Sequence, residues 1–158
     1  LAEAHRLLGK TLLARQRPEE ALAALRRALA LRPETSDACL EIGNNLKALG
    51  AAAEAEAAFL RARELDPRRV EPVINLGNLR FEEKRFEDAL RFYRQAVDMA
   101  PTSVTARVNL AGALFTQGDR AAAASQVEEV LRIDPKYEPA LRLRSMLAVP
   151  VRPAGPSR

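Results

Sequence analysis

Four asparagines are the residues of this chain whose type and spacing could do chemistry. Asn75 and Asn78 lie three residues apart in an apolar, helix-periodic stretch, and a step of 34 residues leads back from Asn78 to Asn44 and forward from Asn75 to Asn109. Asparagine is a middling-to-poor helix former, because its amide competes for backbone hydrogen bonds. The amide can also bond both the N–H and the C=O of an extended peptide. These asparagines therefore predict a patch that binds a peptide backbone; the alternative is that they are solvated surface amides.

Residues that could catalyse a reaction are few. The chain has one histidine, His5, and one cysteine, Cys39, which excludes an internal disulfide and a cysteine metal cluster. The sequence contains no phosphate-binding glycine loop, no HExxH and no nucleophile elbow. The adjacent Glu82 and Glu83 would diverge on a helix. We therefore predict that the chain alone is not an enzyme and has no cofactor and no metal site.

Composition and charge limit the classes of protein further. The chain has 158 residues, a net charge of +4, 47% hydrophobic and 29% charged residues, which is typical of a soluble globular protein. No apolar run is long enough to cross a bilayer, and no signal-peptide pattern is present. The sequence favours the cytoplasm without fixing the compartment. Because the chain starts at Leu1, without Met, we expect it to be cut from a longer protein.

The basic excess disfavours a nucleic-acid partner. Segments 2–35 and 138–158 each carry a net charge of +3, and the segments between them are neutral or slightly acidic. A nucleic-acid footprint usually needs one clustered basic stripe, whereas this excess lies at two ends. Solvated helix faces explain it more simply.

A period of 34 residues runs through the chain. Pro33, Pro67, Pro101 and Pro135 follow one another at this step. Proline cannot continue a helix, so four helices should end in register. Other series keep the same step: Gly9, Gly43, Gly77 and Ala111; Leu8, Ile42, Leu76 and Leu110; Ala21, Ala55, Ala89 and Ala123; Leu25, Phe59, Tyr93 and Val127. We expect the small residues to bring two helices close and the large ones to fill the remaining space.

Each unit reads as two helices joined by a short turn. Apolar residues recur at helical spacing on both sides of a break such as 82–85. Pro18 suits the first position of a helix, and Gly50 and Gly118 suit the turns before the second helices of their units. The short breaks predict antiparallel helical hairpins.

These residues resemble the tetratricopeptide-repeat (TPR) family, whose pattern is W-x2-L-G-x2-Y, then A-x3-F, then P. The second unit reads Cys39-x2-Ile42-Gly43-x2-Leu46, then Ala55-x3-Phe59, then Pro67, and the match extends over residues 2–137. The resemblance implies an all-α fold, a right-handed superhelix (α-solenoid) of stacked antiparallel helical hairpins. The departures are the absence of Trp, Arg80 in place of an aromatic residue or Leu, and Ala111 for Gly; we expect them to loosen packing locally.

The period divides the chain as follows: TPR repeats at 2–35, 36–69, 70–103 and 104–137, a last helix at 138–148, and a disordered tail at 149–158. The last helix is either a cap or the first helix of a truncated repeat. In the second case its apolar face, with Leu141, Leu143 and Leu147, would be partly exposed and open to self-association.

By resemblance, the first helices of the repeats line a concave groove, and the asparagines lie on it. Phe81 and Phe115 would either take apolar ligand side chains there or pack between repeats. Lys10 and Lys47 could meet acidic ligand groups. The carboxylate clamp of chaperone-binding members is incomplete, since Leu40, Thr105 and Asn109 occupy its basic places. A weaker resemblance links the asparagines to the Asn ladder of O-linked N-acetylglucosamine transferases, with Glu41 and Leu7 as departures.

Three functions follow from these observations, in decreasing order. The first is a protein-interaction scaffold that binds an extended peptide or partner segment in the groove. The second is a substrate-recruiting arm cut from a larger enzyme such as a glycosyltransferase. The third is nucleic-acid binding through the basic ends, which a steep loss of affinity with salt would reveal. No small-molecule substrate is expected.

Overall fold

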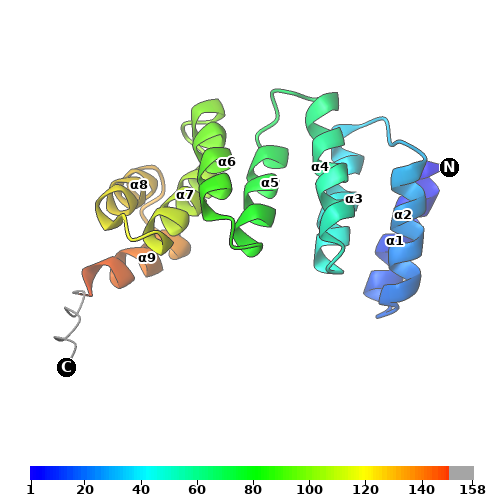
Figure 1. Cartoon of the computed structure of the whole chain (residues 1–158), viewed down its shortest axis with the longest axis horizontal. Coiled ribbons are helices and arrows are strands. Elements are labelled where there is room, and N and C mark those ends of the chain that lie inside the picture. The colour runs from blue at the N-terminus through cyan, green and yellow to red at the C-terminus, as the bar shows by residue number, and fades with distance from the viewer. Residues whose placement is uncertain (150–158) are drawn as a thin grey trace. The chain divides into compact units, whose positions relative to one another are not determined.

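The computed structural model describes residues 1–149, and the predicted tail lies outside them except for Val149. All regular secondary structure within 1–149 is helical (Figure 1). The chain divides into two compact units, the first spanning Leu1–Arg85 and the second beginning at Phe86. The helices of the first unit are α1 (Ala2–Ala14), α2 (Pro18–Ala30), α3 (Ser36–Ala48), α4 (Ala52–Leu65) and α5 (Glu71–Glu82). Those of the second are α6 (Phe86–Met99), α7 (Val104–Thr116), α8 (Arg120–Ile133) and α9 (Glu138–Ala148).

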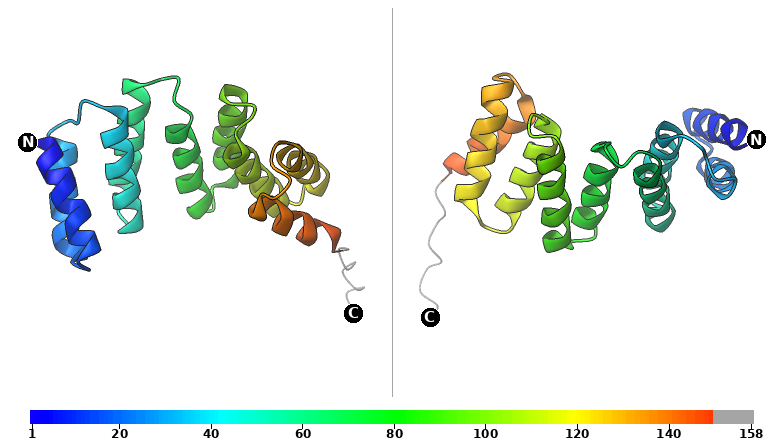
Figure 2. Two further views of the ribbon diagram at one scale, coloured as in Figure 1. Left: turned by 180° about the vertical axis from the view of Figure 1, so that it is seen from behind. Right: turned by 90° about the horizontal axis from the view of Figure 1, so that it is seen from above.

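Helical hairpins are the building element of both units, as the sequence predicts. Figure 2 shows α1 beside α2 and α3 beside α4, and α7 pairs with α8 in the same way. Small residues bring the two helices close: a Cβ on Gly9 would lie 2.6 Å from Leu25 Cγ, and one on Gly43 would lie 2.5 Å from Phe59 Cε1. The side chains of Leu25 and Phe59 are fully buried and fill the space between the helices.

The turns inside the hairpins contain a residue with positive φ at a constant position. Gly50 and Gly118, which the sequence marks as turn residues, have φ values of +77° and +85°. The same place is taken by Gln16 at +58° and Lys84 at +61°. Side chains other than glycine are strained in this left-handed region, so the fold imposes this conformation on two residues that do not favour it.

Arg80 does not loosen the packing around α5. Its side chain is only 12% exposed, and its guanidinium lies between Glu56 of α4, which it contacts, and Glu83, at 2.9 Å. Burial pulls the pKa of Arg80 down, but the hydrogen bonds to Glu83 and Glu56 outweigh it and hold that pKa above its ordinary value. An ion pair between α4 and α5 thus replaces the apolar contact that the family pattern would supply.

Helix α9 packs as a cap on the second unit. Leu143 is buried, and Leu141 and Leu147 are half-buried against a cluster that includes Ala111 of α7 and Val127 of α8. The guanidinium of Arg120 donates to the carbonyl oxygens at the end of α9, those of Met146, Leu147 and Val149, at 3.3, 2.6 and 2.7 Å. The apolar face of this helix therefore contacts α7 and α8 and is not open for self-association. Within residues 1–149 no helix combines the length and the hydropathy that crossing a bilayer requires.

Candidate functional site

Two of the predicted asparagines lie side by side on neighbouring helices of the first unit. Asn75 Nδ2, on α5, donates a hydrogen bond to Asn44 Oδ1, on α3, at 3.1 Å. Asn44 is exposed and Asn75 is half-buried. The bond uses one donor hydrogen of Asn75 and one lone pair of Asn44. Both hydrogens of the Asn44 amide and the carbonyl oxygen of Asn75 make no further bond within residues 1–149 and stay available to a ligand.

Asn78 and Asn109 are placed separately from this pair. Asn78 follows Asn75 by one turn on α5 and is half-buried. Asn109 is half-buried on α7, in the second unit. Both make interactions of their own. The structure therefore describes Asn44 and Asn75 as a bonded pair, and the larger patch of four asparagines stays a prediction.

The basic residues near the pair are already engaged with carboxylates. Glu41 of α3 forms ion pairs with Arg6 and with Lys10 of α1, the second at 2.9 Å. The Lys10 contact is an ion pair without hydrogen-bond geometry, since Glu41 Oε1 has no hydrogen-bond partner. Lys47 of α3 pairs with Glu82 of α5 at 3.0 Å. Lys10 and Lys47 are thus neutralised across the helices.

Glu41 is the functional-site residue whose role the sequence analysis missed. The sequence shows only an acidic residue where the Asn ladder is interrupted. In the structure this carboxylate lies against two cations of the preceding helix. The signal that could have found it is the charge pattern, with two basic residues one turn apart on the first helix and one acidic residue on the next.

The two phenylalanines differ in what the structure shows of them. Phe115 of α7 packs against the buried cluster shared by α7, α8 and α9, and the Arg120 guanidinium lies 5.4 Å from the centre of its ring. These contacts correspond to the packing alternative. Phe81 of α5 is half-buried and has an interaction partner. A ligand-binding role for either phenylalanine stays a prediction.

Cys39 has the properties of a packing residue. Its side chain is fully buried, and its Sγ donates to the carbonyl oxygen of Pro33 at 3.8 Å. Burial raises the pKa of the thiol, which keeps it protonated and unreactive. His5, at the equivalent place on α1, is half-buried. Within residues 1–149 no three His, Cys, Asp or Glu side chains are grouped as a metal ion would require.

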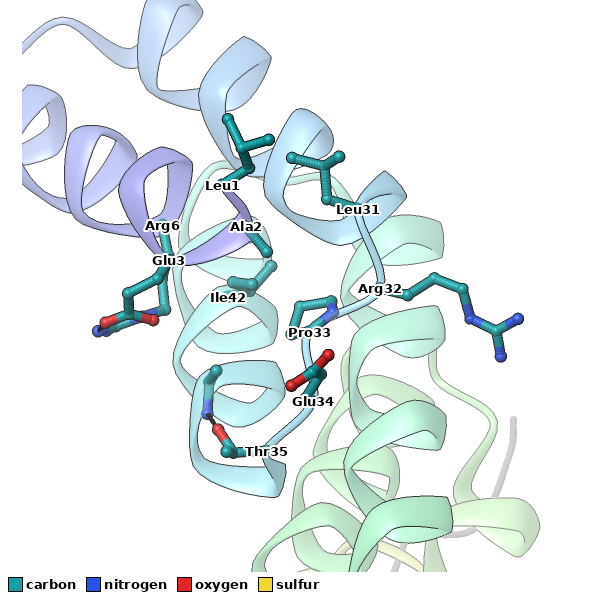
Figure 3. A pocket seen from close by; sticks show the side chains of 11 residues that line it. Leu1, Ala2, Glu3, Arg6, Leu31, Arg32, Pro33, Glu34, Thr35 and Ile42 are labelled. Atoms are coloured by element: carbon teal, nitrogen blue, oxygen red, sulfur yellow. Dashed lines mark hydrogen bonds and ion pairs between the residues drawn. The ribbon is translucent and has the colours of Figure 1, made fainter.

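A cavity of about 330 Å³ lies in the first unit away from the asparagine pair (Figure 3). Leu1, Leu31 and Pro33 lie around it, and Ile42 of α3 lies between them and Arg6. Glu3 and Arg6 lie next to each other at one side, where their side chains are hydrogen-bonded. Neither Asn44 nor Asn75 lines this cavity, so it does not belong to the candidate backbone-binding site.

Comparisons with known proteins agree with this architecture. Family models described as tetratricopeptide repeat match residues 2–35, 36–69 and 80–147. No curated protein sequence matches the chain.

Several solved structures are similar to the chain. One is YrrB, described as a TPR protein with an unusual peptide-binding site, at 21% identity over 92% of this chain and 75% of that one, with a TM-score of 0.77. MamA is 17% identical over 92% of this chain and 80% of its own, with a TM-score of 0.77. The first TPR domain of Spaghetti (RPAP3), bound to an HSP90 peptide, is 22% identical over 72% and 94%, with a TM-score of 0.65. At these identities the likeness establishes the fold alone.

Proposed function

Because the chain belongs to the tetratricopeptide-repeat family, whose members are generally protein-binding scaffolds rather than enzymes, we propose that it is a protein-interaction scaffold. Its ligand is an extended peptide segment of a partner protein, bound on the side of the first unit where Asn44 and Asn75 lie. The contacts of Asn78, Asn109 and the two phenylalanines with the same ligand are part of this proposal. The similar structures support the choice of ligand class, since YrrB is described with a peptide-binding site and the RPAP3 domain with a bound peptide.

The hydrogen bond between Asn75 and Asn44 is the observation that carries the proposal. It holds two side-chain amides of neighbouring helices against each other at 3.1 Å, with the Asn44 amide hydrogens and the Asn75 oxygen left over. A peptide backbone presents the complementary groups, a C=O for the first and an N–H for the second. Each such bond contributes only about 1 kcal/mol net, so several contacts must add up to a useful affinity.

The charged neighbours favour a backbone ligand over a highly charged one. Lys10 and Arg6 are paired with Glu41, and Lys47 is paired with Glu82, so the cations beside the asparagines are compensated. A ligand side chain that carries a charge would have to compete with a carboxylate or a cation already in place. Binding should therefore depend weakly on salt, unlike binding to a nucleic acid.

The proposal is tested with the full chain and a library of unstructured peptides, from which binders are selected and their affinities measured by fluorescence anisotropy. We expect the double variant Asn44→Ala, Asn75→Ala to bind a selected peptide at least about tenfold more weakly, because about 1.4 kcal/mol corresponds to a factor of ten. The variant Gln95→Ala is the matched control, since it removes an exposed amide from α6. Retention of full affinity in the double variant, with circular dichroism unchanged, contradicts the proposal.

A further inference from the structure

One apolar position of the repeat is buried everywhere except in the first helix. Ile42, Leu76 and Leu110 are 0%, 1% and 5% exposed, whereas Leu8, at the same place in α1, is 48% exposed. The difference is not one of residue type, since all four are large and aliphatic. It arises because nothing within residues 1–149 covers that side of the α1–α2 hairpin.

The surface around Leu8 is a hollow that both helices of the hairpin line. We call it the α1–α2 end face; it has a volume of about 650 Å³. Its residues are His5, Leu8, Leu12, Arg17, Glu20, Ala23, Ala24 and Arg27. The asparagine pair and the residues that bond it are not among them, so the end face is distinct from the site of the proposed function and the inference does not depend on that function.

The second hairpin shows what kind of element covers such a surface. Cys39, Ile42 and Leu46 of α3 repeat the positions of His5, Leu8 and Leu12 of α1, and all three are fully buried. The α1–α2 hairpin covers them, with α3 in contact with both of its helices.

A polar contact accompanies this apolar one. Arg26 of α2 donates to Glu54 of α4 at 2.6 Å, and Glu54 repeats the position of Glu20. The interface between the two hairpins therefore combines an apolar surface with charge pairing, and the covering element is helical. The occupant that fits the end face by this rule is an α-helix with an apolar stripe.

The charges of the end face differ from those of the second hairpin and specify the flanks of that helix. Arg17 binds both carboxylate oxygens of Glu20 at 2.6 Å, so Glu20 needs no cation from an occupant. Arg27 is exposed and forms no ion pair within the described part of the chain. The end face thus presents one uncompensated cation beside an apolar hollow, and segment 2–35 as a whole carries +3.

We propose that the α1–α2 end face binds an amphipathic helix of a separate partner protein. The apolar stripe of that helix packs on Leu8 and Leu12, and an acidic residue at its flank pairs with Arg27. A second copy of this chain is a poorer occupant, because segments 2–35 and 138–158 both carry a net charge of +3. The repulsion between two basic surfaces opposes their pairing.

The test uses the full chain and two synthetic helical peptides with the same leucine stripe, one flanked by glutamates and the other by lysines. We expect the glutamate-flanked peptide to bind at least about tenfold more tightly, with amide shifts in an NMR titration at Leu8, Leu12 and Arg27. Arg27→Glu should reverse the preference between the peptides, and Leu8→Glu should weaken both. Leu31→Glu is the matched control, because Leu31 is an exposed leucine that does not line the end face.

The outcomes separate this proposal from others. Equal binding of the two peptides, no binding of either, or shifts confined to Asn44 and Asn75 would overturn it. Concentration-dependent mass in sedimentation of the free chain, lost in Leu8→Glu, would also overturn it by assigning the end face to a second copy. Because Arg27 is exposed, its variant is expected to fold, and circular dichroism checks this.

Discussion

The first and second hairpins have the same sequence pattern and different surroundings. In both, a glycine on the first helix lies against a large buried side chain on the second, Leu25 in α1–α2 and Phe59 in α3–α4. Yet Ile42 is fully buried, whereas half of Leu8 is accessible to solvent. The period therefore sets which residues face the neighbouring hairpin, and the neighbour itself decides how much each residue contributes to stability.

Their polar contacts differ in the same way. Glu54 of the second hairpin is bonded by Arg26 of the first, whereas Glu20 of the first is bonded by Arg17 within its own helix boundary. Local ion pairing thus replaces contact between hairpins where no hairpin covers the surface. This comparison predicts large energetic differences at equivalent positions.

The largest difference is expected between Ile42→Ala and Leu8→Ala. Truncating a fully buried isoleucine removes apolar contacts and leaves a cavity, at a cost of about 2–5 kcal/mol of unfolding free energy. The same truncation at the half-exposed Leu8 should cost less than about 1 kcal/mol. Urea denaturation followed by circular dichroism measures both. Equal costs would mean that the end face is covered in solution, and dilution would then distinguish a second copy.

Gly43→Ala is expected to have the next largest effect. The added Cβ would lie 2.5 Å from Phe59 Cε1 and 2.7 Å from Cδ1, and a flat, fully buried ring cannot move aside cheaply. Such overpacking costs about 1–3 kcal/mol, reduced by the roughly 1 kcal/mol better helix propensity of alanine. Gly9→Ala meets the branched Leu25 in the hairpin whose other side is open, so we expect a smaller loss. Thermal unfolding ranks the two variants, and the reverse order would show that the hairpins relax differently.

The hairpin turns give a smaller contrast. Gly50→Gln puts a side chain at a φ of +77° and should destabilise the chain by about 1 kcal/mol. Gln16→Gly removes that strain at a φ of +58° and should stabilise it by up to about 1 kcal/mol, less the entropy that glycine adds to the unfolded chain. Urea midpoints compare them with the exposed control Glu19→Gln. Destabilisation by Gln16→Gly would show that the glutamine side chain makes a contact worth more than the strain.

Residue types and their period predicted the hairpins, the positive φ at Gly50 and Gly118, and the asparagines on the first helices. These features depend on local conformation and on which face of a helix a residue occupies, and a single sequence records both. The position of α9 was also predicted, but its role was left open. The structure favours a cap through Arg120, a long side chain that reaches the last carbonyl groups of the next helix.

Pairing between helices could not be predicted in the same way. Glu41 could have faced solvent, but it lies against Arg6 and Lys10, and Arg80 could have opened a gap, but it lies between two glutamates. The outcome depends on rotamers of long side chains and on the offset between neighbouring helices, and the period specifies neither. The strain at Gln16 and Lys84 escaped prediction because the stacked helices, rather than the residue type, impose the turn.

The smallest expected effect is a pH dependence of the Glu54 contact. The hydrogen bond from Arg26 lowers the pKa of Glu54 below its unfolded value of 4.5. A carboxylate with a lowered pKa stabilises the fold above that value, and this contribution is lost as the pH falls through the folded pKa. Glu54→Gln should therefore lower the melting temperature relative to the native chain at about pH 6, and the difference should shrink toward about pH 3. Glu19→Gln is the control for general charge effects, because Glu19 is exposed and forms no ion pair within residues 1–149. A difference that stays constant with pH would mean that Arg26 is bound equally well by a neutral amide, and that shape rather than charge joins the two hairpins at this point.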